Sequence, residues 1–355
     1  MRRGLISWSK AELPESALEA RMTRVQAMMA ATGIDVLAVY TNPARESGVA
    51  WLTGFVPYWN QCVLLLPRTG RPVLVAGMTA RVRDWIMRNS HIETVVNTPR
   101  LGPEAARLIA DQAPNAVVAI ADLDRVPGSV VDPIRSKAST LVDGSALLER
   151  ARVPADPFEL AFTFKAATIA HTALARAVPS ETDAAHLVAA IDGEARRLGA
   201  EEVFVAIAPD LAASRRLLRL EGTVPLSGWF AARISVAYKG TWVRMVRTLA
   251  RDVALNRDIA AAVKDFAAAA GRLPQIGALE SFANFIVEGV RTTTPLEPLA
   301  GTIVDRQYAI ELGRIVTIQA TVERNGRAVL VGAPVLIGRD GEASSALVVP
   351  QFDEA

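Results

Sequence analysis

Apolar residues recur along the chain at two alternating spacings, one typical of helices and the other of buried strands. From Leu18 the segment LEARMTRVQAMMAATG places apolar residues at helical spacing and ends at Gly33, a residue that commonly stops a helix. The run from Ile34 to Tyr40 (IDVLAVY) is short and apolar, as a buried strand is. The same succession continues through the first 152 residues. It predicts an α/β layer with a partly parallel sheet.

A junction with two prolines divides the chain. The segment VPADP begins at Val153, and its second proline, Pro157, stands where the first turn of a helix favours proline. We therefore expect one domain at residues 1–152 and a second at 153–355. Because helices precede antiparallel strands in the second domain, its expected class is α+β.

The second domain alternates between the same two patterns. Helices are expected at Pro157 to about Val178, Ala184 to about Leu198, Asn256 to Ala270, and about Leu279 to Gly289. Strands are expected at Glu201 to Pro209, as a pair around Phe230 to Val246, and as a closing hairpin that turns at Asn325-Gly326.

Composition excludes several classes of protein. Hydrophobic residues make up 51% of the chain, and the formal net charge is +2, too small an excess for a phosphate-binding surface. No segment approaches the roughly 20 uninterrupted apolar residues that a membrane span requires. The single cysteine, Cys62, cannot form an internal disulfide, and its apolar setting (QCVLLL) predicts a buried structural thiol. We expect a cytoplasmic protein that binds neither nucleic acid nor membranes.

Several motifs, in the same order along the chain, carry a resemblance to a known family. Tyr238–Thr248 is YKGTWVRMVRT, and it is preceded by DPFE and GAEEVFVAIAP and followed by LGRIVTIQ and VLIGRDGE. Together they resemble the creatinase and aminopeptidase P family, whose version of the first motif is YKGYxxDxxRT. The resemblance covers nearly the whole chain. It implies a creatinase-like amino-terminal α/β domain, a carboxy-terminal pita-bread domain and a dimer.

The positions that hold two metal ions in that family carry other residues in this chain. The two family aspartates fall on Arg233 and Arg244, and the two glutamates fall on Gln319 and Gly332. A family histidine within Gly-His-Gly has no counterpart, and a second falls near Arg216. Because a guanidinium repels a divalent cation, we expect no metal centre and no cofactor.

The substituted positions predict a cluster of positive charge. We expect Arg233, Arg244 and Arg247 to crowd one concave surface, where like charges about 4 Å apart cost around 4 kcal/mol per pair at an effective dielectric of about 20. A local carboxylate or a bound anion must offset that cost. The candidate ligand-binding residues are Arg233, Arg244, Arg247, Arg216 and Gln319, and no catalytic residue is assigned. The alternative is that the arginines face solvent in a widened cleft and have no function.

Other polar residues have structural interpretations. His171 and His186 lie in alanine-rich helical patterns that are typical of packing histidines, and His91 is expected to be exposed before a strand. Glu201 and Glu202 are successive strand residues, so their side chains should face opposite sides and form no acid/base pair.

Two functions fit these expectations. The favoured one is a non-catalytic or regulatory subunit that binds a small anionic (carboxylate) ligand or an active paralogue, as a homodimer or a heterodimer. The alternative is a metal-independent hydrolase of C–N bonds in a small carboxylated amide or guanidino substrate.

Overall fold

The chain folds into two compact units, which meet in sequence between Arg152 and Val153. The computed structural model describes residues 8–43, 47–57, 59–177, 182–220, 222–289, 302–303 and 310–347. Among these residues, no helix combines the length and the apolar character that crossing a membrane requires.

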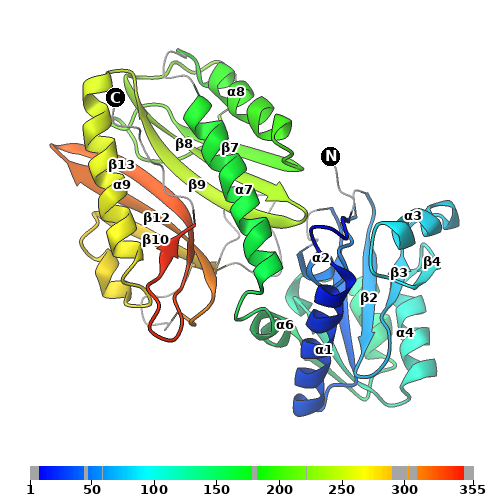
Figure 1. Cartoon of the computed structure of the whole chain (residues 1–355). Helices are drawn as coiled ribbons and strands as arrows, with labels where there is room; N and C mark the ends of the chain where they lie inside the picture. The colour runs from blue at the N-terminus through cyan, green and yellow to red at the C-terminus, as the bar shows by residue number, and fades with distance from the viewer. Residues whose placement is uncertain are drawn as a thin grey trace. The chain divides into compact units, whose positions relative to one another are not determined.

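The first unit is a six-stranded sheet between two layers of helices (Figure 1). Its strand order is β4-β3-β2-β1-β5-β6, with β1 parallel to β5 and antiparallel to β2. The strands are β1 (Val36–Thr41), β2 (Cys62–Pro67), β3 (Val73–Ala76), β4 (Thr94–Asn97), β5 (Val117–Ala121) and β6 (Thr140–Asp143). The α-helices are α1 (Glu15–Thr32), α2 (Ser47–Thr53), α3 (Arg83–Arg88), α4 (Leu101–Gln112), α5 (Gly128–Arg135) and α6 (Ser145–Ala151).

Alternation along the strands gives this sheet its two cores. In β1, Leu37 and Val39 belong to the apolar cluster that includes α1, while Val36 and Ala38 belong to the cluster that includes α4. A strand buried on both faces needs a continuous apolar run, which IDVLAVY supplies. The predicted first helix and strand are confirmed, and Gly33 ends α1 in the left-handed conformation (φ 71°).

The second unit is a sheet with its helices on one side (Figure 1). Its strand order is β11-β10-β12-β13-β9-β8-β7, and β14 pairs with β13. The strands are β7 (Glu202–Ala208), β8 (Trp229–Tyr238), β9 (Thr241–Ala250), β10 (Asn284–Gly289), β11 (Thr302–Ile303), β12 (Ile315–Arg324), β13 (Arg327–Leu336) and β14 (Ser345–Ala346). The α-helices are α7 (Pro157–Arg176), α8 (Ala184–Arg197) and α9 (Asn256–Ala270).

The two faces of this sheet differ in polarity. Along β12, Val316 and Ile318 are fully buried in the core that α7, α8 and α9 share, whereas Thr317 and Gln319 are only half-buried. We call the side packed by these helices the helix face. The opposite side, which carries Arg233, Ser235 and Arg244, is called the site face.

Most predicted elements of the second unit are confirmed, including the closing hairpin at Asn325-Gly326. The helix predicted from Leu279 to Gly289 is wrong. A short 3-10 turn (Ile276–Leu279) precedes β10 instead. The segment Phe285-Ile-Val contains β-branched residues that suit a strand, and pairing with β12 satisfies its backbone groups. Pairing with β12 therefore makes this segment a strand rather than a helix.

Candidate functional site

Three polar residues of the site face lie together on β8 and β9. Ser235 is directly opposite Arg244 in the antiparallel register, and Arg233 is two residues from Ser235 on the same side of β8. Arg244 Nε donates to Ser235 Oγ at 3.3 Å. The sequence prediction that Arg233 and Arg244 share one surface therefore agrees with the geometry.

Arg244 is buried and neutralised by a carboxylate from another strand. Its Nη1 donates to both oxygens of Glu288, at 2.6 Å to Oε1, and the two side chains are only 10% and 15% exposed. Glu288 belongs to β10, the strand mistaken for a helix in the sequence interpretation, so this partner was missed. The alternative that Arg244 faces solvent is wrong, because its charge is satisfied inside the protein.

Arg233 differs from its neighbour in having no such partner. It is half-buried, and no carboxylate of the described residues lies within ion-pair distance of its guanidinium. Burial, and then repulsion by Arg244, lower the pKa of Arg233 to about 10. A lowered pKa means that the surroundings destabilise the charged guanidinium, and a small anion bound beside it would stabilise that charge.

Gln319 lies on the same face as Arg233. Arg233 lies opposite Val246 on the neighbouring strand, Val246 lies opposite Gly332, and Gly332 lies opposite Gln319. Residues opposite one another on paired strands share a face of the sheet. Gln319 is half-buried, and its amide could donate to or accept from a bound ligand. Gly332 has no side chain, and a Cβ there would lie 3.1 Å from Val246 Cγ2, so the strands are closely packed at this point.

Arg247 does not join this group. It is three residues from Arg244 on one strand, so the two side chains lie on opposite faces. Arg247 Nη2 donates to His171 Nδ1 of α7 at 2.8 Å on the helix face. The prediction that Arg247 crowds the same surface as Arg233 and Arg244 is wrong for this reason. His171 is, as predicted, a packing residue on a helix.

Arg216 lies apart from these residues as well. It is exposed in the loop between β7 and β8, where its backbone N–H donates to Ser214 Oγ at 3.3 Å. No contact in the described residues brings it to Arg233 or Arg244, so the structure supplies no support for its assignment to the site.

The remaining polar candidates have structural partners. The Glu201 carboxylate accepts from the backbone N–H of Gly240 at 3.1 Å and so braces the β8–β9 turn. Cys62 is fully buried, as predicted. His91 is not exposed: its side chain is 11% exposed and lies 3.3 Å from Arg71 Nη1 and 3.6 Å from Glu19 Oε1.

The residues at the family's metal-binding positions do not fit a metal ion. A guanidinium has no lone pair for a cation, Gly332 has no side chain, and Gln319 offers one neutral oxygen. Among the described residues, no three His, Cys, Asp or Glu side chains are grouped closely enough to hold a metal. The chemistry of this donor set favours anions rather than divalent cations.

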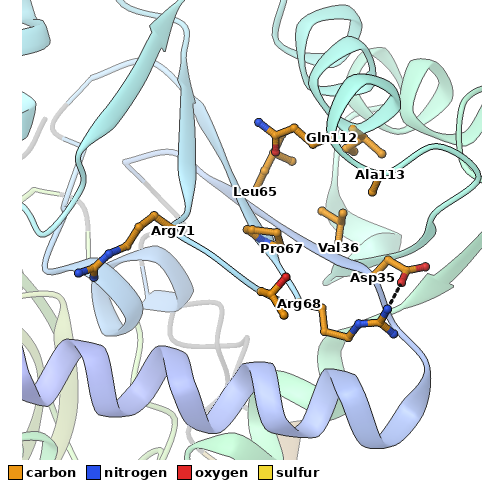
Figure 2. A pocket seen from close by; sticks show the side chains of 10 residues that line it. Asp35, Val36, Leu65, Pro67, Arg68, Arg71, Gln112 and Ala113 are labelled. Carbon is orange, nitrogen blue, oxygen red and sulfur yellow. Dashed lines mark ion pairs between the residues drawn. The ribbon is translucent and has the colours of Figure 1, made fainter.

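A hollow of about 490 Å³ also opens in the first unit, between β1, β2 and the end of α4 (Figure 2). Its charged side chains do not point toward a common position where a ligand could bind. Arg68 pairs with Asp35 at 3.0 Å, and Asp35 also accepts from the Val117 backbone. Figure 2 shows Arg71 extending away from Gln112, and Arg71 pairs with Glu19 at 3.2 Å. We therefore assign no ligand to this hollow.

Comparison with known proteins supports the resemblance drawn from the motifs. Residues 21–153 match the Creatinase/Prolidase N-terminal domain. The fold is similar to a prolidase from Pyrococcus horikoshii OT3, with 15% identity, a TM-score of 0.70 and coverage of 94% of this chain and 99% of that one. No curated protein sequence matches the chain.

Two further structures extend this likeness. A Bacillus anthracis Xaa-Pro dipeptidase has a TM-score of 0.69 and 16% identity, with coverage of 94% and 99% of the two chains. An X-Pro aminopeptidase from Thermotoga maritima MSB8 has a TM-score of 0.71 and 13% identity, with coverage of 93% and 98%. At these identities the likeness establishes the fold, and that fold contains both the creatinase-like domain and the pita-bread domain.

Proposed function

We propose that this chain, which has a creatinase/prolidase amino-terminal domain and the prolidase fold over nearly its whole length, has no metal centre and binds a small carboxylate at Arg233. In this role it is a non-catalytic or regulatory subunit, either of a homodimer or beside an active paralogue. The observation that carries the proposal is the contrast between Arg244, paired with Glu288, and Arg233, which has no carboxylate partner in the described residues.

The charge balance supports an anion rather than a cation as ligand. Glu288 offsets one of the two guanidinium charges, which leaves an excess of one positive charge on this part of the site face. An arginine binds a carboxylate through two parallel N–H···O bonds, and partial burial strengthens such bonds relative to water. Gln319 supplies a neutral group on the same face that could hydrogen-bond to the rest of a small ligand.

The test compares binding in three proteins. Isothermal titration calorimetry with succinate and N-acetylglycine should show binding to the native chain, weakened at least tenfold in Arg233→Gln, since a charge-assisted hydrogen bond contributes about 1.5–3 kcal/mol. Arg257→Gln makes the same charge change at an exposed position of α9 and should bind normally. Equal affinities in all three proteins would remove the basis of the proposal.

The subunit role has a separate test. The chain alone should not hydrolyse Xaa-Pro dipeptides, the substrates for which the Bacillus anthracis relative is named, either with Mn²⁺ supplied or with chelator present. Turnover of a carboxylated amide with chelator present, lost in Arg233→Gln, would instead favour the metal-independent hydrolase.

A further inference from the structure

A second hollow, this one in the carboxy-terminal unit, is lined by apolar residues and two arginines, a combination that suits a ligand pocket. It has a volume of about 360 Å³ and lies between the loop after β7, the start of β8 and the tip of the β12–β13 hairpin. We call it the hairpin pocket. Its lining is Leu211, Ala212, Ala213, Ser214, Arg215, Trp229, Gly326, Arg327 and Ala328. It shares no residue with the Arg233 site.

The apolar wall of the hairpin pocket is held in place by hydrogen bonds. Trp229 Nε1 donates to the carbonyl oxygen of Ala328 at 2.8 Å, which fixes the indole against the hairpin. The backbone N–H of Leu211 donates to the carbonyl oxygen of Trp229 at 3.0 Å and ties the loop to the same residue. Such a preformed apolar surface binds a flat or aliphatic group without the cost of ordering its own side chains.

The charged groups of the lining are all positive. Arg215 and Arg327 line the hairpin pocket, and no Asp or Glu does. Arg215 pairs outside the lining with Glu323 at 2.7 Å. The Asp258 carboxylate is 3.9 Å from Arg327 Nη1, and it already accepts a hydrogen bond from Asn325 Nδ2 at 2.8 Å. Arg327 therefore keeps most of its five N–H donors for another acceptor.

We propose that the hairpin pocket binds a carboxylate attached to a short apolar or aromatic group. The carboxylate lies against Arg327, with Arg215 beside it, and the apolar group lies against Trp229 and Leu211. The volume falls within the range of small-molecule sites, roughly 300–1,000 Å³. Two sources offer this chemistry: a free acid, or the last residue of a peptide with its terminal carboxylate.

The test uses defined probes on the full chain. 3-Phenylpropionate, the peptide Ala-Ala-Phe and the same peptide with an amidated end are titrated by calorimetry, and the Trp229 indole N–H is followed by NMR. We expect at least one acid to bind and to shift that resonance, while the amide binds at least tenfold more weakly than its acid. Binding of 3-phenylpropionate identifies a free acid as sufficient, and binding of the peptide acid alone identifies a chain end.

Matched variants separate this pocket from other sites. Arg327→Gln should weaken the acid binding that the Trp229 resonance reports at least tenfold, while Arg219→Gln, which replaces an exposed arginine outside the lining, should leave it unchanged. Arg327→Lys keeps the positive charge but lacks the planar guanidinium. Its affinity for the acid should lie between that of the native chain and that of Arg327→Gln. Equal binding of 3-phenylpropanol and 3-phenylpropionate, equal affinity in Arg327→Gln, or no binding of either acid at about 10 mM would overturn the assignment.

Discussion

Arg244 and Glu288 form an ion pair across the second-unit sheet, although β13 and β12 separate their strands. The pair joins β9 to β10, which are not hydrogen-bonded to each other. It also explains how the fold tolerates a guanidinium at a position where the related family is expected to have an aspartate. The chain supplies its own carboxylate from β10, which lies beyond β13 and β12 in the sheet.

A double-mutant cycle on this pair should show strong coupling. Arg244→Met and Glu288→Leu should each destabilise the protein by about 3–5 kcal/mol, because each leaves one buried charge without its partner. The double variant should lose less than the sum, since both charges of the pair are removed together. Urea unfolding measures the three changes. Additive losses would show that the two side chains do not interact in solution.

Anion binding at Arg233 should fail in alkali. Burial and Arg244 lower the pKa of Arg233 to about 10, so its guanidinium is charged below that pH and neutral above it. The affinity for succinate should therefore be constant from pH 7 to about 9 and fall as the pH rises through about 10. An ordinary arginine would keep its affinity throughout this range, so a flat profile to pH 11 contradicts a role for Arg233.

His171 should make the protein sensitive to mild acid. Burial, and then the Arg247 guanidinium, hold the pKa of His171 below its ordinary value of 6.5. As the pH falls through 6.5, His171 is protonated in the unfolded chain but not yet in the folded chain. Protonation therefore favours the unfolded chain, and the free energy of unfolding decreases. The urea midpoint should drop from pH 7.5 to 5, and the drop should be smaller in His171→Asn, whose amide oxygen can still accept from Arg247. His186→Asn is the matched control on α8.

Removal of metal should leave the protein unchanged. Because guanidinium groups occupy two of the family's ligand positions, dialysis against EDTA should not alter the melting temperature, and added Mn²⁺ should not raise it. Elemental analysis of the purified chain should find less than stoichiometric transition metal. A melting temperature that falls on chelation and recovers with Mn²⁺ would show that other residues hold a metal.

Cys62 should be inert in the native protein. Burial raises the pKa of its thiol to about 12, and only the thiolate reacts with disulfide reagents. At pH 8 the native chain should react with Ellman's reagent only as fast as it unfolds, while the urea-unfolded chain should react at once. Rapid labelling of the native protein would place the thiol at the surface.

The local pattern identified most of the elements because the sequence itself carries their signals. Gly33 ends the first helix, Pro157 begins the helix of the second unit, and Asn325-Gly326 turns the final hairpin. Each depends on backbone conformations that these residue types favour before any tertiary contact forms. The strand pair predicted around Phe230 to Val246 likewise placed Arg233 and Arg244 on adjacent strands.

The sequence by itself determined that two guanidinium groups stand where the related family is expected to have carboxylates. Only the tertiary structure decided how their charges are met. Glu288 is 44 residues from Arg244 in sequence, and no local signal links them. Strand pairing placed β10 beside β12 and so brought the two charges together, while the two-residue period of β9 turned Arg247 away to His171. Charge pairing depends on distance in space, and distance in space is set by the packing of the whole sheet.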